Sequence, residues 1–313
     1  MNENLKIDFL LREEIDDKRW NASIDKAING NIYAYTWYLD VVSPGWGALV
    51  TPDYNYLFPL PIKRKYGINY IIQPLFCQQL GLFTSQQITP GIVDRFIESI
   101  PQTFKYIDIN LNIHNKTNEF IKDSDKRKTY LLDLLDYNEH LFIKYNQNTK
   151  RNILKAIANE LIVTDKLPLH EFVKIYREYG FTVRGDKDIK LIERLAEVLI
   201  TQNRATIWGV ANRLYQLGSV ALFAESHNTL CYLFGASKHE FRENGAMFLI
   251  IDGVIHKNSG MDKVLDFEGS ELRGIARFFE GFGAKPCTFY NYKKNVLPAG
   301  ELLVRIKQKL KLI

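Results

Sequence analysis

Two carboxylates in the C-terminal half of the chain have the spacing of residues that could accept a proton. Asp266 and Glu268 alternate with Leu265 and Phe267 in a short apolar run. Because alternate residues of a strand face the same side, both carboxylates are predicted to lie on one face. In a cleft they could take a proton from an attacking amine. They could equally accept hydrogen bonds from neighbouring backbone groups, and the sequence leaves both interpretations open.

An arginine and a glycine belong to a second group of residues, which could bind a ligand. The polar stretch 238–244 carries Arg242 and leads into Gly245, which opens an apolar segment of helix length. Free backbone N–H groups at a helix start, beside an arginine, favour the binding of phosphate. The sequence therefore predicts a loop that holds an anionic carrier. The residues assigned to this site are Ser237, Arg242, Asn244, Gly245 and Ala246.

A third pair lies within the predicted helix itself. Asp252 and His256 are four residues apart, so their side chains could touch on one helix face. They form either a base with its orienting partner or an ordinary pair on the helix surface.

No Gly-x-Ser-x-Gly, Walker or dinucleotide-binding loop occurs in the sequence. Their absence argues against a hydrolase, an NTPase and an oxidoreductase.

The segment that must position these residues alternates strands with helices. A strand is predicted at 230–235, a helix at 245–257, a second strand at 264–267 and a helix that ends at Gly283. Short apolar strands that alternate with helices predict a layered α/β core. The first half has strands at 48–51, 54–62 and 68–73, then a helix at 89–99 and strands at 106–113 and 129–134.

The residues of this segment carry a resemblance to a known family. The Arg242–Gly245 loop, LDFEGS and ARFFEGFGA resemble the second half of the Fem-type aminoacyl and peptidyl transferases, which belong to the GCN5-related N-acetyltransferase (GNAT) superfamily. NQNTKRNILKA, at 146–156, resembles the basic helix start that opens the second fold in that family. The resemblance implies two tandem GNAT-like domains, each a mixed central sheet flanked by helices, at 1–136 and 137–313.

The resemblance also implies a reaction and a set of substrate-binding residues. Fem-type proteins suggest transfer of an acyl or aminoacyl group from acyl-CoA or aminoacyl-tRNA to an amine by direct attack. The acceptor would be a small molecule or a cell-wall precursor. In the family, the helix after residue 146 edges the groove between the folds, which assigns Arg151 and Asn152 to substrate binding. Arg277 is assigned to the same role.

Two departures from the GNAT and Fem patterns bear on this reaction in opposite ways. The first fits the resemblance, since Fem-type enzymes generally lack the full pyrophosphate signature, and the second puts the reaction in question. The GNAT pyrophosphate signature ends in a small residue where this chain has Met247, which counts against ordinary acetyl-CoA chemistry. The Fem pattern has a lysine where this chain has Phe279. A phenyl ring cannot donate a hydrogen bond to an oxyanion, and one lost donor costs about 10²–10³ in rate. A catalytically inactive binding module that keeps the groove is therefore the alternative, and a conventional acetyl-CoA enzyme is a third.

Composition sets wider limits on function. With 41 basic and 36 acidic residues the net charge is +5, which is compatible with coenzyme A or tRNA as a ligand and is also common in proteins that bind neither. DNA is not expected as a partner. The three cysteines have no paired spacing, so no metal site is expected. The apolar run AMFLIIDGVI is too short to span a bilayer, and no signal peptide is visible, so a cytoplasmic location is expected.

Two further stretches of the first half have open interpretations. The aromatic passage from Tyr33 to Trp46 is either a buried packing face or the lining of a substrate groove. The basic run Lys63 to Lys65 is predicted as a hairpin tip, either a solvated turn or a phosphate contact.

Overall fold

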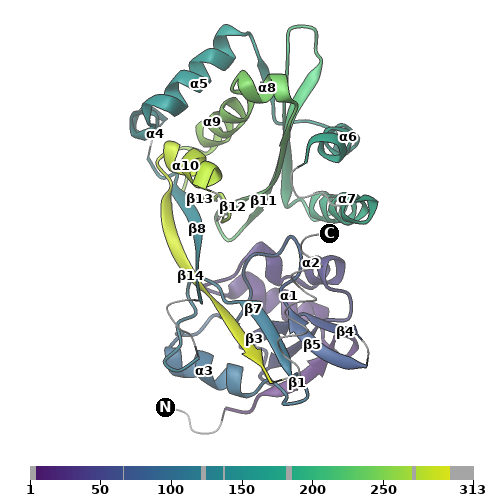
Figure 1. Cartoon of the computed structure of the whole chain (residues 1–313). Helices are drawn as coiled ribbons and strands as arrows, with labels where there is room; N and C mark the ends of the chain where they lie inside the picture. The colour runs from purple at the N-terminus through teal and green to yellow at the C-terminus, as the bar shows by residue number, and fades with distance from the viewer. Residues whose placement is uncertain are drawn as a thin grey trace. The chain divides into compact units, whose positions relative to one another are not determined.

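The structure is a computed structural model and describes residues 5–65, 67–120, 125–136, 138–180, 185–269 and 273–296. The chain divides into two compact units (Figure 1). Unit 1 is Met1–Arg127 with Thr288–Ile313, and unit 2 is Lys128–Cys287. The sequence suggested a single boundary after residue 136. In the structure the chain instead passes from unit 1 to unit 2 at residue 128 and returns at residue 288.

Unit 1 contains two sheets and a small group of helices. One sheet has the antiparallel order β1-β2-β3-β6, and the other has the order β4-β5-β7-β14, in which β5 and β7 are parallel. The elements are β1 (Asp8–Leu11), η1 (Arg12–Glu14), α1 (Asp17–Lys26), η2 (Ile32–Ala34), α2 (Thr36–Val42), β2 (Gly47–Val50), β3 (Tyr56–Leu60), β4 (Ile62–Lys65), β5 (Ile68–Ile72), β6 (Phe83–Thr84), α3 (Pro90–Glu98), β7 (Tyr106–Asn110) and β14 (Lys285–Asn295).

Local sequence signals explain where several of these elements lie. The predicted helix at 89–99 is confirmed as α3, and the side chain of Thr89 accepts a hydrogen bond from the Ile92 amide as its N-cap. In β7 the apolar residues Ile107 and Ile109 are buried. They enter the core of unit 1 because alternate strand residues share a face.

The aromatic passage of unit 1 is a buried packing face. Tyr33, Tyr38 and Trp46 are buried, and the Trp46 ring meets Trp20 edge-on at 4.9 Å between centroids. The Trp20 indole donates a 2.7 Å hydrogen bond to the Ala34 carbonyl, which satisfies its one polar group. The first interpretation of this passage is therefore confirmed.

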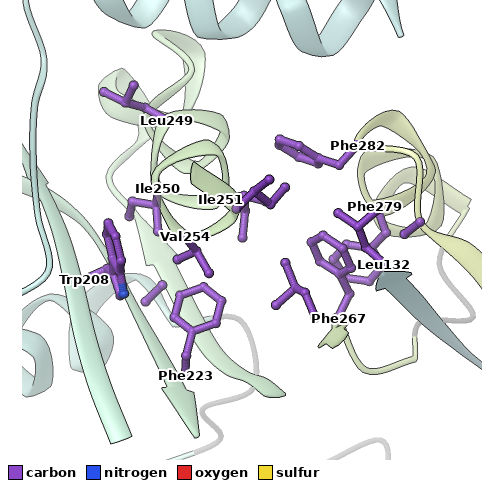
Figure 2. Packing of buried hydrophobic residues seen from close by; sticks show 14 of the residues in the cluster. Leu132, Trp208, Phe223, Leu249, Ile250, Ile251, Val254, Phe267, Phe279 and Phe282 are labelled. Carbon is purple, nitrogen blue, oxygen red and sulfur yellow. The ribbon is translucent and has the colours of Figure 1, made fainter. Parts of the chain in front are cut away.

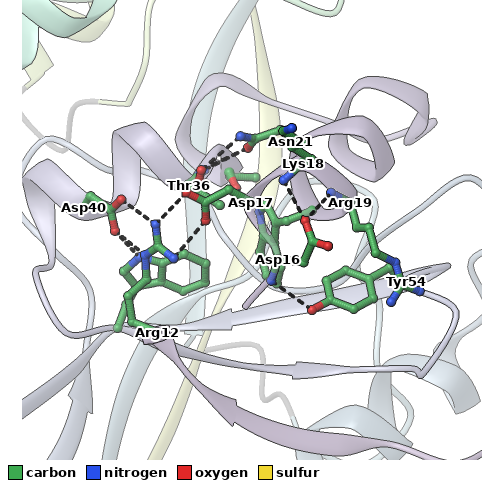
Figure 3. Close-up of polar contacts among 12 residues, drawn as sticks. Arg12, Asp16, Asp17, Lys18, Arg19, Asn21, Thr36, Asp40 and Tyr54 are labelled. Atoms are coloured by element: carbon green, nitrogen blue, oxygen red, sulfur yellow. Dashed lines mark hydrogen bonds and ion pairs between the residues drawn. The ribbon is translucent and has the colours of Figure 1, made fainter. Parts of the chain in front are cut away.

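A charged cluster fixes the start of α1 against α2 (Figure 3). The Arg12 guanidinium donates to both carboxylate oxygens of Asp40, at 2.5 and 2.7 Å, and also contacts Asp17. The indole of Trp46 donates to Asp40 at 2.9 Å. The hydrogen bonds to Asp40 hold the pKa of the guanidinium above its ordinary value. A bidentate pair of this kind has a fixed geometry, and here it links η1 to α2.

The predicted hairpin is present, but the basic run forms its first strand, which leads into the turn, and not the tip itself. Residues Ile62–Lys65 form strand β4, which pairs with β5 so that Lys63 lies opposite Tyr70. Burial lowers the pKa of Lys63. The predicted strand 54–62 is divided at Pro61, because β3 pairs with β2 and β6 in one sheet and β4 pairs with β5 in the other.

Unit 2 is built on a mixed sheet of order β8-β13-β12-β11-β10-β9, in which only the β12–β13 pair is parallel. Its elements are β8 (Lys126–Asp133), α4 (Asn138–Lys144), α5 (Gln147–Ala158), β9 (Ile162–Thr164), α6 (Leu169–Tyr179), α7 (Asp186–Thr201), β10 (Ala205–Ala211), β11 (Leu217–Ser226), β12 (Thr229–Ser237), α8 (His239–Glu243), α9 (Ala246–Asn258), β13 (Val264–Asp266) and α10 (Arg273–Gly281).

Helices cover both faces of this sheet. Figure 1 shows α9 on one side of β11 and α6 on the other. The α9 side is the larger core, where Phe223, Ile251, Phe267 and Phe282 are buried together (Figure 2). On the other side, the ring of Tyr176 meets Phe234 edge-on at 5.6 Å. The predicted α/β class, with a mixed sheet flanked by helices in each unit, is confirmed.

Turn and cap residues again explain the local structure of unit 2. His227 and Asn228 both have positive φ angles, 50° and 54°, which is the geometry of a tight hairpin between β11 and β12. Asn146 accepts a 2.8 Å hydrogen bond from the Thr149 amide and begins α5 as predicted. Helix α6 starts at Leu169, and Pro168 occupies its N-cap position. Among the described helices, none has the length and apolar character needed to cross a membrane.

Candidate functional site

The candidate site of unit 2 begins where the two parallel strands part. Strand β13 pairs with β12 from Thr229↔Val264 to Cys231↔Asp266, and β12 then continues without it to Ser237. A bulge on β12 follows at once, because its register with β11 shifts between Tyr232 and Phe234. Asp266 is therefore the last residue of β13, at the point where the parallel ladder ends.

The carboxylate of Asp266 is buried and held in place by two donors. Its residue is 8% exposed. The hydroxyl of Thr129 donates to Oδ1 at 2.5 Å, and the Glu268 amide donates to the same oxygen at 2.8 Å. Burial raises the pKa of Asp266 to about 6, while both hydrogen bonds act in the opposite direction. This carboxylate is thus a stronger base than an exposed aspartate and is still largely ionised at neutral pH.

Glu268 lies just outside the strand, in an unusual backbone conformation. Its φ of 59° is in the left-handed region, which non-glycine residues rarely adopt. Its Oε1 lies 3.5 Å from the Sγ of Cys231, the residue in register with Asp266. Asp266 and Glu268 therefore both contact the neighbouring strands, although β13 ends one residue earlier than the expected strand 264–267.

The predicted phosphate loop has a different local structure from the one expected. Residues His239–Glu243 form the short helix α8, because the Arg242 amide donates to the Lys238 carbonyl at 2.9 Å and the Asn244 amide to Glu240 at 3.0 Å. The expectation of an irregular loop is therefore wrong. Arg242 is exposed and, within the described residues, forms no ion pair. Its guanidinium can therefore accept an anionic ligand without breaking an existing pair.

The glycine of this segment is required by the fold. Gly245 has a φ of 79° and caps α9 in the left-handed conformation. A Cβ at this position would lie 2.3 Å from the backbone oxygen of Asn152. Helix α5 therefore packs directly on the start of α9, where Lys155 also donates to the Glu243 carbonyl at 2.8 Å. Within the part of the chain that the structure describes, no side chain caps the first turn of α9.

The other predicted binding residues are distributed around this junction. Ala246 is fully buried in the core, and the Ser237 hydroxyl accepts a 2.7 Å hydrogen bond from Ser219. Asn244 is partly buried. Arg151 is exposed on α5 and donates to Asn148 at 2.7 Å. The structure thus brings Asn152 against Gly245, while Asp266 and Glu268 form a second group around Thr129 and Cys231.

The position expected to carry a lysine belongs to the core. Phe279 is 4% exposed and stacks on Phe267 at 4.8 Å between ring centroids (Figure 2). Tyr130 lies at 5.8 Å from the same ring. Arg277, two residues earlier on α10, is exposed. The two side chains therefore point to different surroundings, as the helical spacing predicts.

Asp252 has a partner that the sequence did not indicate. Burial raises the pKa of Asp252, and a hydrogen bond from Tyr145 opposes this rise. Tyr145 is buried, and its own pKa is raised by burial and by the charge of Asp252. His256 acts on Asp252 only through its charge. This hydrogen bond joins α9 to the residue that follows α4.

Sequence reasoning missed Thr129 and the contact of Cys231 with Glu268. Thr129 was placed in a strand, but its partner lies 137 residues away, and no local pattern indicates that contact. Cys231 is buried, and the spacing of the cysteines gave no indication of its contact with Glu268. Among the described residues, no group of three His, Cys, Asp or Glu side chains could hold a metal ion.

Comparisons with known proteins support the fold. The alignment with the crystal structure of FemX includes 91% of this chain and 97% of the FemX chain, with a TM-score of 0.62 and 12% sequence identity. L-PGS from Bacillus licheniformis covers 92% and 96%, with a TM-score of 0.54 and 9% identity. The C-terminal domain of a putative lysylphosphatidylglycerol synthetase from Agrobacterium fabrum covers 86% and 90%, with a TM-score of 0.52 and 10% identity.

Sequence-level comparisons gave no match. No model of a protein family matches the chain, and no curated protein matches it. At identities of 9 to 12% the structural likeness shows the fold alone. The resemblance to Fem-type proteins is therefore confirmed at the level of the fold.

Proposed function

We propose that the chain is an N-acyltransferase that passes an acyl or aminoacyl group from an activated donor to an amine. The donor is acyl-CoA or aminoacyl-tRNA, and the acceptor is a small molecule or a cell-wall precursor. The proposal is supported by the Fem-like fold and by the surroundings of Asp266. Of these two observations, the surroundings of Asp266 are the one that supports a catalytic step.

Asp266 has the properties of a general base. A base is most effective when its pKa lies near the working pH, and burial raises the pKa of this carboxylate to about 6. Within the described residues, both hydrogen bonds to the carboxylate end on Oδ1. Oδ2 is then the oxygen that takes the proton. The two donors fix the orientation of the carboxylate without using this second oxygen.

The reaction would proceed in a single complex of donor and acceptor. The amine nitrogen forms a bond to the acyl carbonyl carbon, and the bond from that carbon to the ester oxygen or thioester sulfur breaks. The electron pair of the broken bond leaves with the oxygen or sulfur. The proton of the attacking amine passes to Asp266, which then returns it to the leaving group or to solvent. Glu268 is the second candidate for this step.

The donor would be held at the junction of α8 and α9. The first turn of α9 has no side-chain cap, and Arg242 is exposed beside it. Amides at a helix start and a guanidinium together favour a phosphate group. Arg151 and Asn152 on α5 border this position, since Asn152 contacts Gly245. Arg277 is the further cation proposed to contact substrate.

The test is Asp266→Asn in an assay that follows transfer by mass spectrometry. Acyl-CoA and aminoacyl-tRNA are each offered with a panel of amines. The variant should lose about 10²–10⁴ in rate, the contribution of a positioned base, while thermal shift by the donor is unchanged. Asp262→Asn, at an exposed aspartate of the same unit, serves as the matched control and should turn over as wild type. Wild-type turnover by Asp266→Asn rejects the role of Asp266.

The alternative function is a binding module without catalysis. The burial of Phe279 favours it, because that position offers no donor to an oxyanion. Such a module would be stabilised by the donor and the amine but would yield no product in the same assay. Arg242→Ala separates the binding step, since it should weaken stabilisation by coenzyme A or aminoacyl-tRNA in either case.

A further inference from the structure

Large apolar side chains are exposed over one part of unit 2. Exposed fractions reach 70% for Ile143, 60% for Leu154, 75% for Leu214 and 82% for Tyr215. Monomeric proteins seldom leave such side chains grouped on the surface without a binding role. We call this group the apolar–basic face. It consists of Phe142, Ile143, Lys150, Arg151, Leu154, Lys155, Ile157, Ile162, Leu214 and Tyr215.

The α4–α5 part of this face is continuous. Lys150 donates to the Ile143 carbonyl at 3.3 Å, and its ammonium lies 5.4 Å from the centre of the Phe142 ring. Leu154 is four residues further along α5, and residues at this spacing are neighbours on a helix surface. Ile157 follows three residues later. Leu154 and Ile157 therefore form an exposed apolar pair on α5, one and two turns beyond Lys150.

The β10–β11 turn continues the face beyond the end of α5. The Glu160 amide donates to the Ile157 carbonyl at 2.9 Å, and Glu160 forms an ion pair with Arg213. Arg213 directly precedes Leu214 in the turn. In Figure 1 the hairpin that leads into β11 and the helix α5 both reach the end of unit 2 that carries α8. The two apolar groups are thus joined through the Glu160–Arg213 pair.

The cations of this face are not neutralised by carboxylates within the described residues. Lys150 donates to the Ile143 carbonyl, Arg151 to the Asn148 amide oxygen, and Lys155 to the Glu243 carbonyl. All of these acceptors are uncharged. The face therefore combines exposed apolar side chains with a local excess of positive charge.

We propose that the apolar–basic face binds the surface of an anionic phospholipid bilayer. Apolar side chains of a surface helix enter the boundary between headgroups and acyl chains, while lysine and arginine contact the phosphates. A tyrosine at the tip of a turn suits the headgroup level. A nucleic acid would need the cations but would leave Leu154, Ile157 and Leu214 in water. The proposal does not depend on the acyl-transfer activity.

The experiment measures binding of the full chain to sedimented vesicles. Vesicles of phosphatidylglycerol mixed with phosphatidylcholine are compared with vesicles of phosphatidylcholine alone. Wild type should bind the anionic vesicles preferentially and be partly released by salt. Lys150→Gln should weaken binding about fivefold, since one basic residue near an anionic surface contributes on the order of 1 kcal/mol.

Two double variants test the apolar part. The first double variant is Leu154→Gln with Ile157→Gln, and glutamine has a helix propensity close to that of the residues it replaces. Leu214→Asn with Tyr215→Asn suits the turn, where Tyr215 has a φ of 57° that asparagine tolerates well. Each should weaken binding about tenfold or more, because each removes several apolar carbon groups from the membrane. Met261→Gln, an exposed apolar residue of the same unit outside this face, is the matched control and should bind as wild type.

Three results would overturn the proposal. Wild type could fail to bind anionic vesicles, or both double variants could bind as well as wild type while their melting temperatures stay normal. The third is a wild-type dimer in gel filtration that the double variants dissociate, without a change in vesicle binding. That result would identify the face as a contact between copies of this chain.

Discussion

The hydroxyl of Thr129 on β8 donates a 2.5 Å hydrogen bond to Oδ1 of Asp266 on β13, across 137 residues of sequence. The bond stabilises the ionised carboxylate and so opposes the effect of burial, and the pKa of Asp266 is about 6 with both influences present. Thr129 therefore adjusts the basicity of the group to which we assign proton transfer. It touches the carboxylate and is a positioning residue.

Removal of this hydroxyl should change the pH dependence of Asp266. In Thr129→Val the donor is lost while the shape of the side chain is kept, so the pKa of Asp266 should rise above the value of about 6. The acid limb of the pH–rate profile should move to higher pH, and the NMR titration of the Asp266 carboxyl should move with it. Thr129→Ser keeps a hydroxyl and should titrate near wild type. An unchanged titration in Thr129→Val would show that the bond has no such effect.

Asp266→Asn should make unit 2 more stable at neutral pH. The pKa of this carboxyl is about 6 in the folded chain against an ordinary value of 3.8. Between about pH 4 and 6 the folded state keeps a proton that the unfolded state has released, so the free energy of unfolding falls as the pH rises. The loss amounts to about 3 kcal/mol above pH 6. Asparagine has no such titration.

Urea unfolding from pH 4 to 8 measures this effect. The stability difference between Asp266→Asn and wild type should grow through the window and level off above pH 6, at no more than about 3 kcal/mol. A difference that is constant with pH would mean that Asp266 is ionised in both states throughout. Asp25→Asn offers a control for an aspartate outside this site.

Gly245→Ala should cost more stability than the same change at another left-handed glycine. Gly45 and Gly245 have almost the same φ, 77° and 79°, but a Cβ at Gly45 meets no atom within 4 Å. Alanine in this conformation costs about 1–2 kcal/mol by itself. At Gly245 the Cβ also meets the Asn152 carbonyl at 2.3 Å, so α5 and α9 must separate. Thermal melts of the two variants compare them, and equal losses would contradict the close packing.

Phe279→Lys should destabilise unit 2 instead of creating transfer activity. The change brings the sequence closer to the Fem pattern, but Phe279 is packed between Phe267 and Tyr130. Loss of a buried ring costs about 3–5 kcal/mol, and a buried ammonium adds a further cost. Chemical denaturation measures the loss. Arg277→Ala, on the exposed side of the same helix, should leave the melting temperature unchanged, and a folded, more active Phe279→Lys would disprove the assignment of this position to the core.

Much of the local structure of unit 2 could be predicted because its signals are local. Asn146 begins α5, the His227–Asn228 turn joins two strands, and Gly245 precedes α9, each through backbone geometry within a few residues. Strand β14 was not predicted, because its pairing with β7 joins residues far apart in the chain. The sequence predicts a loop where the structure has helix α8, because the polar residues of this segment show no apolar periodicity.

The sequence by itself determined the alternation of strands and helices, the position of the Arg242–Gly245 segment and the presence of Asp266 in a short strand. Periodicity and turn residues specify such features without distant contacts. Only the tertiary structure decided that Asp266 is buried beside Thr129 and that Phe279 belongs to the core. It also decided that Gly245 lies against the backbone of Asn152. Burial and hydrogen bonding depend on which distant segments meet, so the chemical character of a side chain is settled by packing and not by its neighbours in sequence.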